Sequence, residues 1–325
     1  MDKPQTVNGL MRHLRKECHI QISGSLQKQQ LISYGYYHGY KGYRFFKNTS
    51  TPIPYTDFSQ IVAVIEYDSN LKSMLYPHLM FLETSLKNII CNESVQGLSN
   101  PTFDCLFQNR MNDNTTDTAL QLKRLQLKNI IYSTISKQYR SEERKENKMI
   151  RHFYNRGEDA PVWSIFEIIF LSDLATFYDC LNMNIREKIL NGLNMLDTSI
   201  DTNRTILSTS IYTLKSLRNA VAHNNIIFDT RFKDRNINKA LKMWLEKETG
   251  INNITLYSLV DYLILISCLL KRLDFSKKRA LNLIEQFEMY NKKLKNDLPV
   301  EICDVILYHN TDVKISLLKK YLKSK

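Results

Sequence analysis

Apolar residues recur along this chain at steps of three and four positions, the spacing of one face of a helix. The longest such pattern runs from Asp57, a suitable N-cap, to Cys91. A buried helix is expected after Pro161, and residues 92–116, rich in Asn, Ser, Thr and Asp, are expected to be irregular. Further helices are expected over residues 5–17, 25–33, 117–154, 236–249, 254–273, 276–296, 299–308 and 311–322. No alternating strand pattern competes with these helices, so the sequence predicts an all-α fold.

One more helix, expected over about residues 201–223, carries polar residues among its apolar ones. The stretch LRNAVAHNN, residues 217–225, contains Arg218, Asn219 and His223. Asn219 and His223 are four positions apart and share a face, whereas Arg218 and His223 differ by about 140° around an ideal helix. Arg218 and His223 can converge only if the arginine folds around the helix or if two copies of the helix meet across one cleft.

The composition narrows the class of protein. Only 9 glycines and 7 prolines occur in 325 residues, which favours long helices with few turns. The six cysteines show no C-x-x-C spacing, and the histidines are dispersed, so we expect a reducing cytoplasm and neither a metal site nor a cofactor.

The amino terminus lacks the apolar core of a signal peptide. The most hydrophobic run, residues 256–270, contains Asp261 and is shorter than the roughly 20 residues that span a bilayer, so no membrane association is expected.

The net charge of +12 predicts a polyanionic partner. Thirteen Lys or Arg and seven Asp or Glu occur from Lys271 onward, and no acidic residue occurs between Cys18 and Thr56. The second segment interleaves tyrosines with cations, which suits base stacking and phosphate neutralisation. Aromatic packing in the core, beside solvated lysines, is the alternative interpretation. The residues expected to contact RNA are Lys28, Tyr36, Tyr37, His38, Tyr40, Lys41, Tyr43 and Arg44.

The motif R-N-x-x-x-H, formed by Arg218, Asn219 and His223, resembles the R-x4-6-H signature of the HEPN superfamily (higher eukaryotes and prokaryotes nucleotide-binding domains). The wider pattern is similar to the Abi family of abortive-infection proteins, the AbiD and AbiF group. Where that family commonly has an arginine in the aromatic segment, this chain has His38. The matching marks, which cover about residues 3–235, are Lys3-Pro4, SYGYYHGY (33–40), the segment with Asp68 and Glu83, PVW (161–163) and LRNAVAHN.

This resemblance implies a HEPN-like helical bundle with additional N- and C-terminal helices. Residues 1–250 would form the Abi/HEPN-like domain, and residues 251–325 a basic helical extension packed on it. The implied activity is metal-independent RNA cleavage in phage defence, often by a homodimer with a composite cleft. A ribose 2′-hydroxyl would attack the adjacent phosphodiester while His223 moves protons, Arg218 stabilises phosphate charge and Asn219 orients either His223 or the phosphate.

Three alternatives remain open from the residues themselves. Arg218 and His223 can be a structural pair that caps neighbouring helices. The chain can also be a catalytically silent protein that holds a structured noncoding RNA on its basic aromatic surface. A pure protein–protein module is the third alternative, and the charge of +12 makes it less attractive.

Overall fold

The computed structural model describes residues 6–47, 49–114, 116–140, 148–233 and 235–324. These residues form helices and no strand, which confirms the predicted all-α class. The first half contains α1 (Val7–Glu17), α2 (Gly24–Tyr34), the π-helix η1 (Gly35–Lys41), α3 (Phe58–Val95), α4 (Phe103–Arg110), α5 (Thr118–Arg140), α6 (Lys148–Tyr154) and α7 (Val162–Ile168). The second half contains α8 (Leu171–Cys180), α9 (Met183–Gly192), α10 (Ile206–Ala222), α11 (Lys239–Thr249), α12 (Leu259–Arg272), α13 (Lys277–Asp297), α14 (Val300–Ile306) and α15 (Thr311–Lys323).

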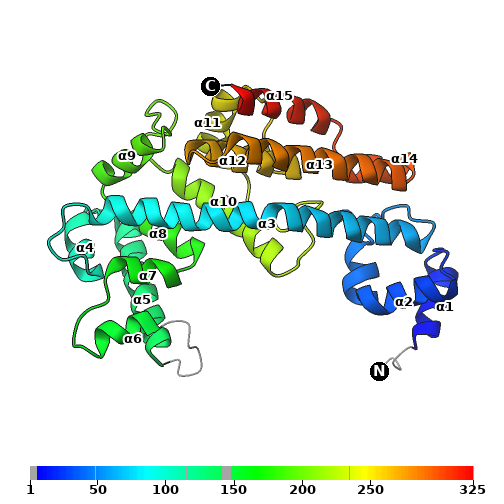
Figure 1. Ribbon diagram of the computed structural model, residues 1–325, viewed down its shortest axis with the longest axis horizontal. Coiled ribbons are helices and arrows are strands. Elements are labelled where there is room, and N and C mark those ends of the chain that lie inside the picture. The colour runs from blue at the N-terminus through cyan, green and yellow to red at the C-terminus, as the bar shows by residue number, and fades with distance from the viewer. Residues whose placement is uncertain (1–5, 48, 115, 141–147, 234, 325) are drawn as a thin grey trace.

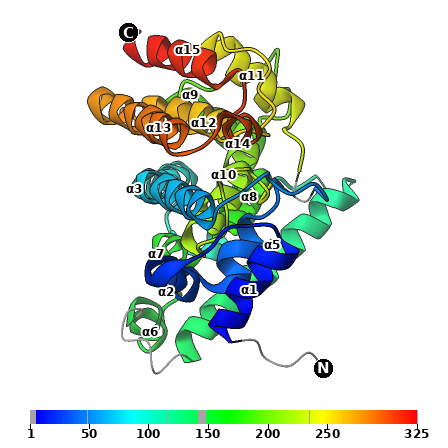
Figure 2. The same ribbon diagram turned by 90° about the vertical axis from the view of Figure 1, so that its right-hand side faces the viewer.

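Helix α3 is the axis of the molecule, and the other helices lie along or across it (Figures 1 and 2). Helices α11 to α15 lie on one side of α3, with α13 packed along it. Helices α4 to α8 lie on the other side at one end of α3, and α1 and α2 lie at its opposite end. Helix α10 packs between α8 and α3, so the motif helix lies near the centre of the molecule.

The long pattern predicted from Asp57 is α3, which extends to Val95, beyond the predicted end. Its N-terminus is fixed by a capping box in which the Asp57 carboxylate accepts the Ser59 N–H at 2.8 Å and the Gln60 side chain accepts the Asp57 N–H at 3.2 Å. Apolar residues are buried on several faces of this helix because it contacts helices on both sides.

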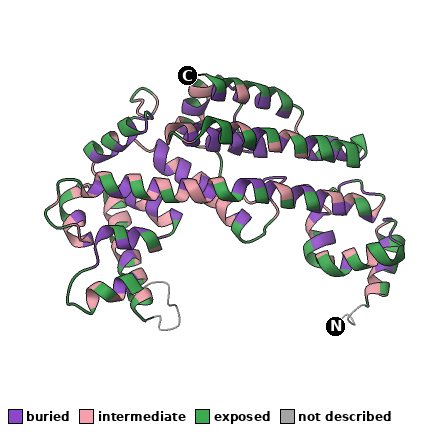
Figure 3. Cartoon of the chain, viewed as in Figure 1, coloured by how far each residue is buried: buried purple, intermediate pink, exposed green. Residues whose placement is uncertain are grey.

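The C-terminal helices share the hydrophobic core with the rest of the chain. Every residue of α12 from Leu259 to Leu270 is buried, as expected for the run at 256–270 (Figure 3). One hydrophobic cluster includes residues from Met11 to Leu322, so the basic C-terminal helices pack on α3 and on one another. Nowhere in the described part of the chain is a helix both long enough and apolar enough to cross a membrane.

Two sequence expectations about elements are wrong, and part of a third lies outside the described residues. The segment 92–116, expected to be irregular, contains α4, which begins where the Thr102 hydroxyl accepts the Cys105 N–H at 3.4 Å. The buried helix expected after Pro161 is two helices, α7 and α8, separated at Ile169 and Phe170. The helical pattern predicted over 117–154 contains the helices α5 and α6. Its charged middle, residues 141–147, lies outside the described residues, as do Lys3 and Pro4.

Candidate functional site

The motif helix α10 begins later than the sequence suggested and ends one residue before the histidine. The Asp201 carboxylate accepts the backbone N–H of Ile206 at 2.8 Å, so Asp201 caps the helix from five positions upstream. The last residue in the helix is Ala222, and His223 is the C-cap, whose N–H donates to the Asn219 carbonyl at 3.0 Å. Asn224 has a left-handed backbone with φ of 55°, which ends the helix. His223 is therefore presented at an exposed helix end.

Arg218 is held against α3. Its Nε donates to Glu83 Oε2 at 2.8 Å, and its Nη1 donates to Asn219 Oδ1 at 3.3 Å. Lys87 also contacts the Glu83 carboxylate, with 3.3 Å between Nζ and Oε1. Because two cations share one carboxylate, this cluster keeps a net positive charge. A guanidinium fixed in this way can hold an anion without first losing side-chain freedom.

On an ideal helix, Arg218 and His223 would point about 140° apart. The Arg218 guanidinium lies against α3, where it bonds to Glu83. In the described part of the chain, the Arg218 guanidinium bonds to Glu83 and Asn219 and makes no hydrogen bond to the His223 ring. The Arg218 side chain therefore reaches the neighbouring Asn219 but not His223 in this structure.

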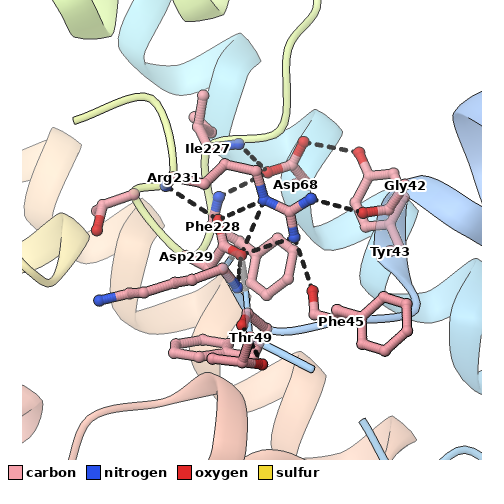
Figure 4. Close-up of polar contacts among 12 residues, drawn as sticks. Gly42, Tyr43, Phe45, Thr49, Asp68, Ile227, Phe228, Asp229 and Arg231 are labelled. Carbon is pink, nitrogen blue, oxygen red and sulfur yellow. Dashed lines mark hydrogen bonds and ion pairs between the residues drawn. The ribbon is translucent and has the colours of Figure 1, made fainter. Parts of the chain in front are cut away.

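The chain that follows His223 is anchored on the buried carboxylate of Asp68 in α3 (Figure 4). Asp68 Oδ1 accepts the N–H groups of Ile227 and Phe228, both at 2.8 Å. Asp68 Oδ2 accepts the hydroxyl of Tyr43 at 2.8 Å and lies 2.7 Å from Lys72 Nζ. Burial, together with the charge of Asp68, raises the pKa of Tyr43 well above its usual value, so this hydroxyl remains a donor. The carboxylate thus joins α3, the aromatic segment and the end of α10.

Lys72 extends this anchor to the residue beside His223. Its Nζ donates to Asn224 Oδ1 at 2.8 Å, and the Asn224 carbonyl lies 3.4 Å away. An open cavity of about 350 Å³ lies at this end of α10. It is lined by Ser69, Lys72, Ser73, Tyr76, Val221 and Asn224. Lys72 therefore holds the helix end that carries His223 against one wall of a polar depression.

A second ion pair, which sequence reasoning missed, completes the anchor (Figure 4). Arg231 bonds to the buried Asp229 carboxylate at 2.7 Å, and it also donates to the carbonyls of Gly42 at 2.8 Å and Phe45 at 2.7 Å. The sequence offered one sign of this pair, the spacing D-x-R at residues 229–231, which follows the asparagine turn at residues 224–225. The pair lies on a loop, and its partners are backbone carbonyls some 190 positions away, with separations of 189 and 186 residues. No local pattern points to such partners.

The residues predicted to contact RNA separate into three groups by exposure. Tyr37, with 76% of its surface exposed, lies with exposed His38 and Lys41 on η1, and Lys41 Nζ is 5.0 Å from the Tyr37 ring centroid. Tyr40 and Tyr43 are 0% and 1% exposed. Neither buried ring can stack on a base, so for these two residues core packing is the correct interpretation. Residues of intermediate exposure are Lys28, Tyr36 and Arg44.

The described residues contain no cluster of three or more His, Cys, Asp or Glu side chains placed to hold a metal ion. All six cysteines are free thiols. Burial raises the pKa of Cys91 and Cys180 to about 11 and that of Cys268 to about 12. These three thiols are protonated at neutral pH and are poor metal ligands in that form.

The fold and this site define an all-helical protein in which an aromatic segment, the long helix α3 and a polar motif helix are joined around one buried carboxylate. A family model described as Abi-like protein matches residues 29–229, more than half of the 325 residues, and the chain belongs to that family. The matched range contains Asp68, Glu83 and the whole R-N-x-x-x-H motif. No curated protein and no solved structure matches the chain. Membership of the Abi-like family supports a role in abortive infection, a form of phage defence.

Proposed function

We propose that this Abi-like protein acts in phage defence as a HEPN-type endoribonuclease that uses Arg218, Asn219 and His223 without a metal ion. The observation that carries the proposal is the placement of the motif. His223 is exposed at the end of α10, and Arg218 is fixed one turn away by Glu83. A histidine needed only for packing would be buried, and this one is not.

The chemistry requires two proton transfers and one site for negative charge. His223 takes the proton of a ribose 2′-hydroxyl as that oxygen attacks the adjacent phosphorus. The bond to the 5′-oxygen breaks, a 2′,3′-cyclic phosphate forms, and the leaving 5′-oxygen receives a proton. Imidazole groups exchange protons near neutral pH, which suits both transfers. Arg218 stabilises the charge on the phosphate oxygens, and Asn219, bonded to Arg218, orients the guanidinium.

The proposed active form is a homodimer with a composite cleft. Arg218 and His223 of one chain face different sides of α10, so each site takes Arg218 from one copy and His223 from the other. The exposed face of η1, with Tyr37, His38 and Lys41, supplies RNA contacts outside the cleft. A flat ring beside an ammonium group suits a base and its phosphate.

The test is His223→Ala, compared with His309→Ala as the matched control, because His309 is also exposed but lies before α15. We expect His223→Ala to abolish RNA cleavage and growth arrest while RNA affinity and melting temperature stay at the parental values, because an exposed ring contributes little to stability. The control should cleave normally. Cleavage should also persist in EDTA, since the chemistry uses no metal.

Two results would overturn this assignment. If His223→Ala folds and still cleaves RNA, the motif is not catalytic. If the purified parent binds RNA tightly but never cleaves it, the second candidate applies, a silent protein that holds a structured noncoding RNA; the net charge of +12 favours that candidate over a protein–protein module.

A further inference from the structure

Two adjoining cavities lie beside α10, away from the cluster formed by Arg218 and Glu83. Their volumes are about 510 and 480 Å³, and they share Lys233, Arg235 and Asn236, so they form one continuous groove. Hydroxyl, amide and cationic side chains dominate its walls. The first cavity is also lined by Ser172, Thr209, Tyr212, Thr213, Lys215 and Ser216, and the second by Lys47, Thr49, Thr230, Arg231 and Tyr257.

Two lysines of the groove, Lys47 and Lys233, lie against the same tyrosine ring and donate to backbone carbonyls. Lys47 Nζ lies 4.7 Å from the centroid of the Tyr257 ring, and Lys233 Nζ lies 3.4 Å from the same centroid. Lys47 also donates to the Tyr257 carbonyl at 3.2 Å, and Lys233 to the Thr255 carbonyl at 2.9 Å. Burial lowers the pKa of both amines, and the charge of Lys47 lowers the pKa of Lys233 further. Two ammonium groups on one ring repel each other, and an anion between them would relieve that repulsion.

The nearby carboxylates are already engaged. Asp229 is bound by Arg231, and Asp261 is buried and bonded to Lys314 at 2.6 Å. Asp234 lies outside the described residues. Among the described residues, Lys47, Lys233 and Arg235 line the groove and no Asp or Glu does, so its walls carry a positive charge.

The groove is aligned with His223 along α10. Thr209, Thr213 and Ser216 line the first cavity, and Ser216 precedes His223 by seven residues. Seven residues of an ideal helix bring the chain back to within about 20° of the same face, about 10 Å further along the axis. A nucleic-acid strand that lies in the groove can therefore continue along this face of α10 to His223, the proposed catalytic residue.

We propose that this groove binds the sugar–phosphate backbone of the single-stranded RNA substrate beside the cleaved bond, with Lys47, Lys233 and Arg235 contacting its phosphates. The inference rests on the proposed function and adds the path of the substrate. Each cavity is within the roughly 300–1,000 Å³ of ligand pockets, and hydroxyls and amides suit ribose and base edges. Lys233 and Arg235 lie beyond residue 229, where the family match ends.

The test measures binding of a fluorescent single-stranded RNA of about 12 nucleotides, a length within the usual site sizes, by anisotropy at several salt concentrations. The protein is the His223→Ala variant, so that the RNA stays intact. Adding Lys47→Met and Lys233→Met keeps the aliphatic stems but removes both charges. We expect about tenfold weaker binding and a log–log salt slope flatter by about 1.4, from two contacts at about 0.7 each. Lys137→Met with Lys188→Met removes the same charge from exposed sites on α5 and α9 and should change neither quantity.

Arg235→Ala is a second variant at an exposed position, for use if the lysine pair proves unstable, and it should flatten the slope by about 0.7. Unchanged affinity and slope in the groove variants, with cleavage still dependent on His223, would refute the groove and leave the nuclease intact. Loss of affinity for adenosine monophosphate, with RNA affinity unchanged, would assign the groove to a free nucleotide and refute the RNA path. Groove-dependent RNA binding by a parent that never cleaves would refute the nuclease instead.

Discussion

The carboxylate of Asp68 is the residue on which the surroundings of the motif depend most. A buried carboxylate is costly unless its oxygens are bonded and its charge is paired, and Asp68 has both. Its donors come from three segments that are distant in sequence: the aromatic segment, α3 and the loop after α10. Removing this one charge should therefore loosen all three segments together.

We predict that Asp68→Asn lowers the free energy of unfolding by about 3–5 kcal/mol. Lys72 then lacks its buried charged partner, and the new side-chain NH₂ group faces the N–H and O–H donors that Asp68 accepts. Tyr43→Phe, which removes only one donor, should cost about 1 kcal/mol. Urea denaturation of both variants measures the difference. Equal costs for the two variants would mean that the charge of Asp68 contributes nothing beyond a single hydrogen bond.

At the same scale, the sequence identified some site residues and missed others for physical reasons. The polar residues Arg218, Asn219 and His223 could be found because they interrupt an apolar helical pattern. The ion pair between Arg218 and Glu83 joins residues 135 positions apart, and no local pattern reports such a contact. Tyr37 and Tyr40 have the same side chain and similar neighbours, so only the packing of η1 separates the exposed ring from the buried one.

Among the elements, the π-helix η1 shapes the aromatic segment. Gly35, with φ of 79°, ends α2, as the sequence suggested, but the chain then continues in a wider helical turn. A Cβ at Gly39 would lie 3.0 Å from the Cβ of Tyr34 and 3.2 Å from its carbonyl carbon, five positions earlier. The absence of a side chain at Gly39 therefore permits the wide turn that buries Tyr40 and exposes Tyr37.

We expect Gly39→Ala to lower the free energy of unfolding by about 1–3 kcal/mol, since its methyl group meets backbone atoms of Tyr34 that cannot rotate away. Gly192→Ala, at the end of α9, is the matched control because nothing lies within 4 Å of the added Cβ. That control should stabilise the protein by about 0.4–1 kcal/mol. Thermal melting compares the two variants, and a stabilising Gly39→Ala would show that η1 relaxes at no cost.

Which elements could be predicted depended on how clearly their ends are marked. Helices α3 and α11 were found because Asp57 caps one and left-handed Gly250 closes the other. The break between α7 and α8 has no glycine or proline. It is marked by the Asp173 carboxylate, which accepts the Phe170 N–H at 3.4 Å. Helix α4 is only 8 residues long, and the residues before it, around Pro101, are polar. The composition of this segment therefore resembled that of a loop.

At the scale of the whole molecule, the positions of Arg218 and His223 argue for two chains in the active form. Helix α10 is central, yet its C-terminal end with His223 is exposed to solvent. Arg218 is held on the α3 side by Glu83, so one chain presents the two residues separately. A symmetric dimer that brings the two α10 ends together would form two equivalent sites. Light scattering should then report about twice the 38.2 kDa chain mass.

Mixing two inactive variants tests this arrangement directly. Arg218→Ala and His223→Ala should each abolish cleavage when pure, since each homodimer lacks one residue in both sites. After subunit exchange in an equal mixture, half of the dimers contain one copy of each variant, and one of their two sites has both residues. Recovery of about one quarter of the parental activity is therefore expected. The matched mixture of His223→Ala with an Arg218→Ala, His223→Ala double variant has no complete site and should stay inactive. If the first mixture also stays inactive although exchange is shown by mass, while the parent cleaves RNA, each chain completes its own site and Arg218 must leave Glu83 to reach His223.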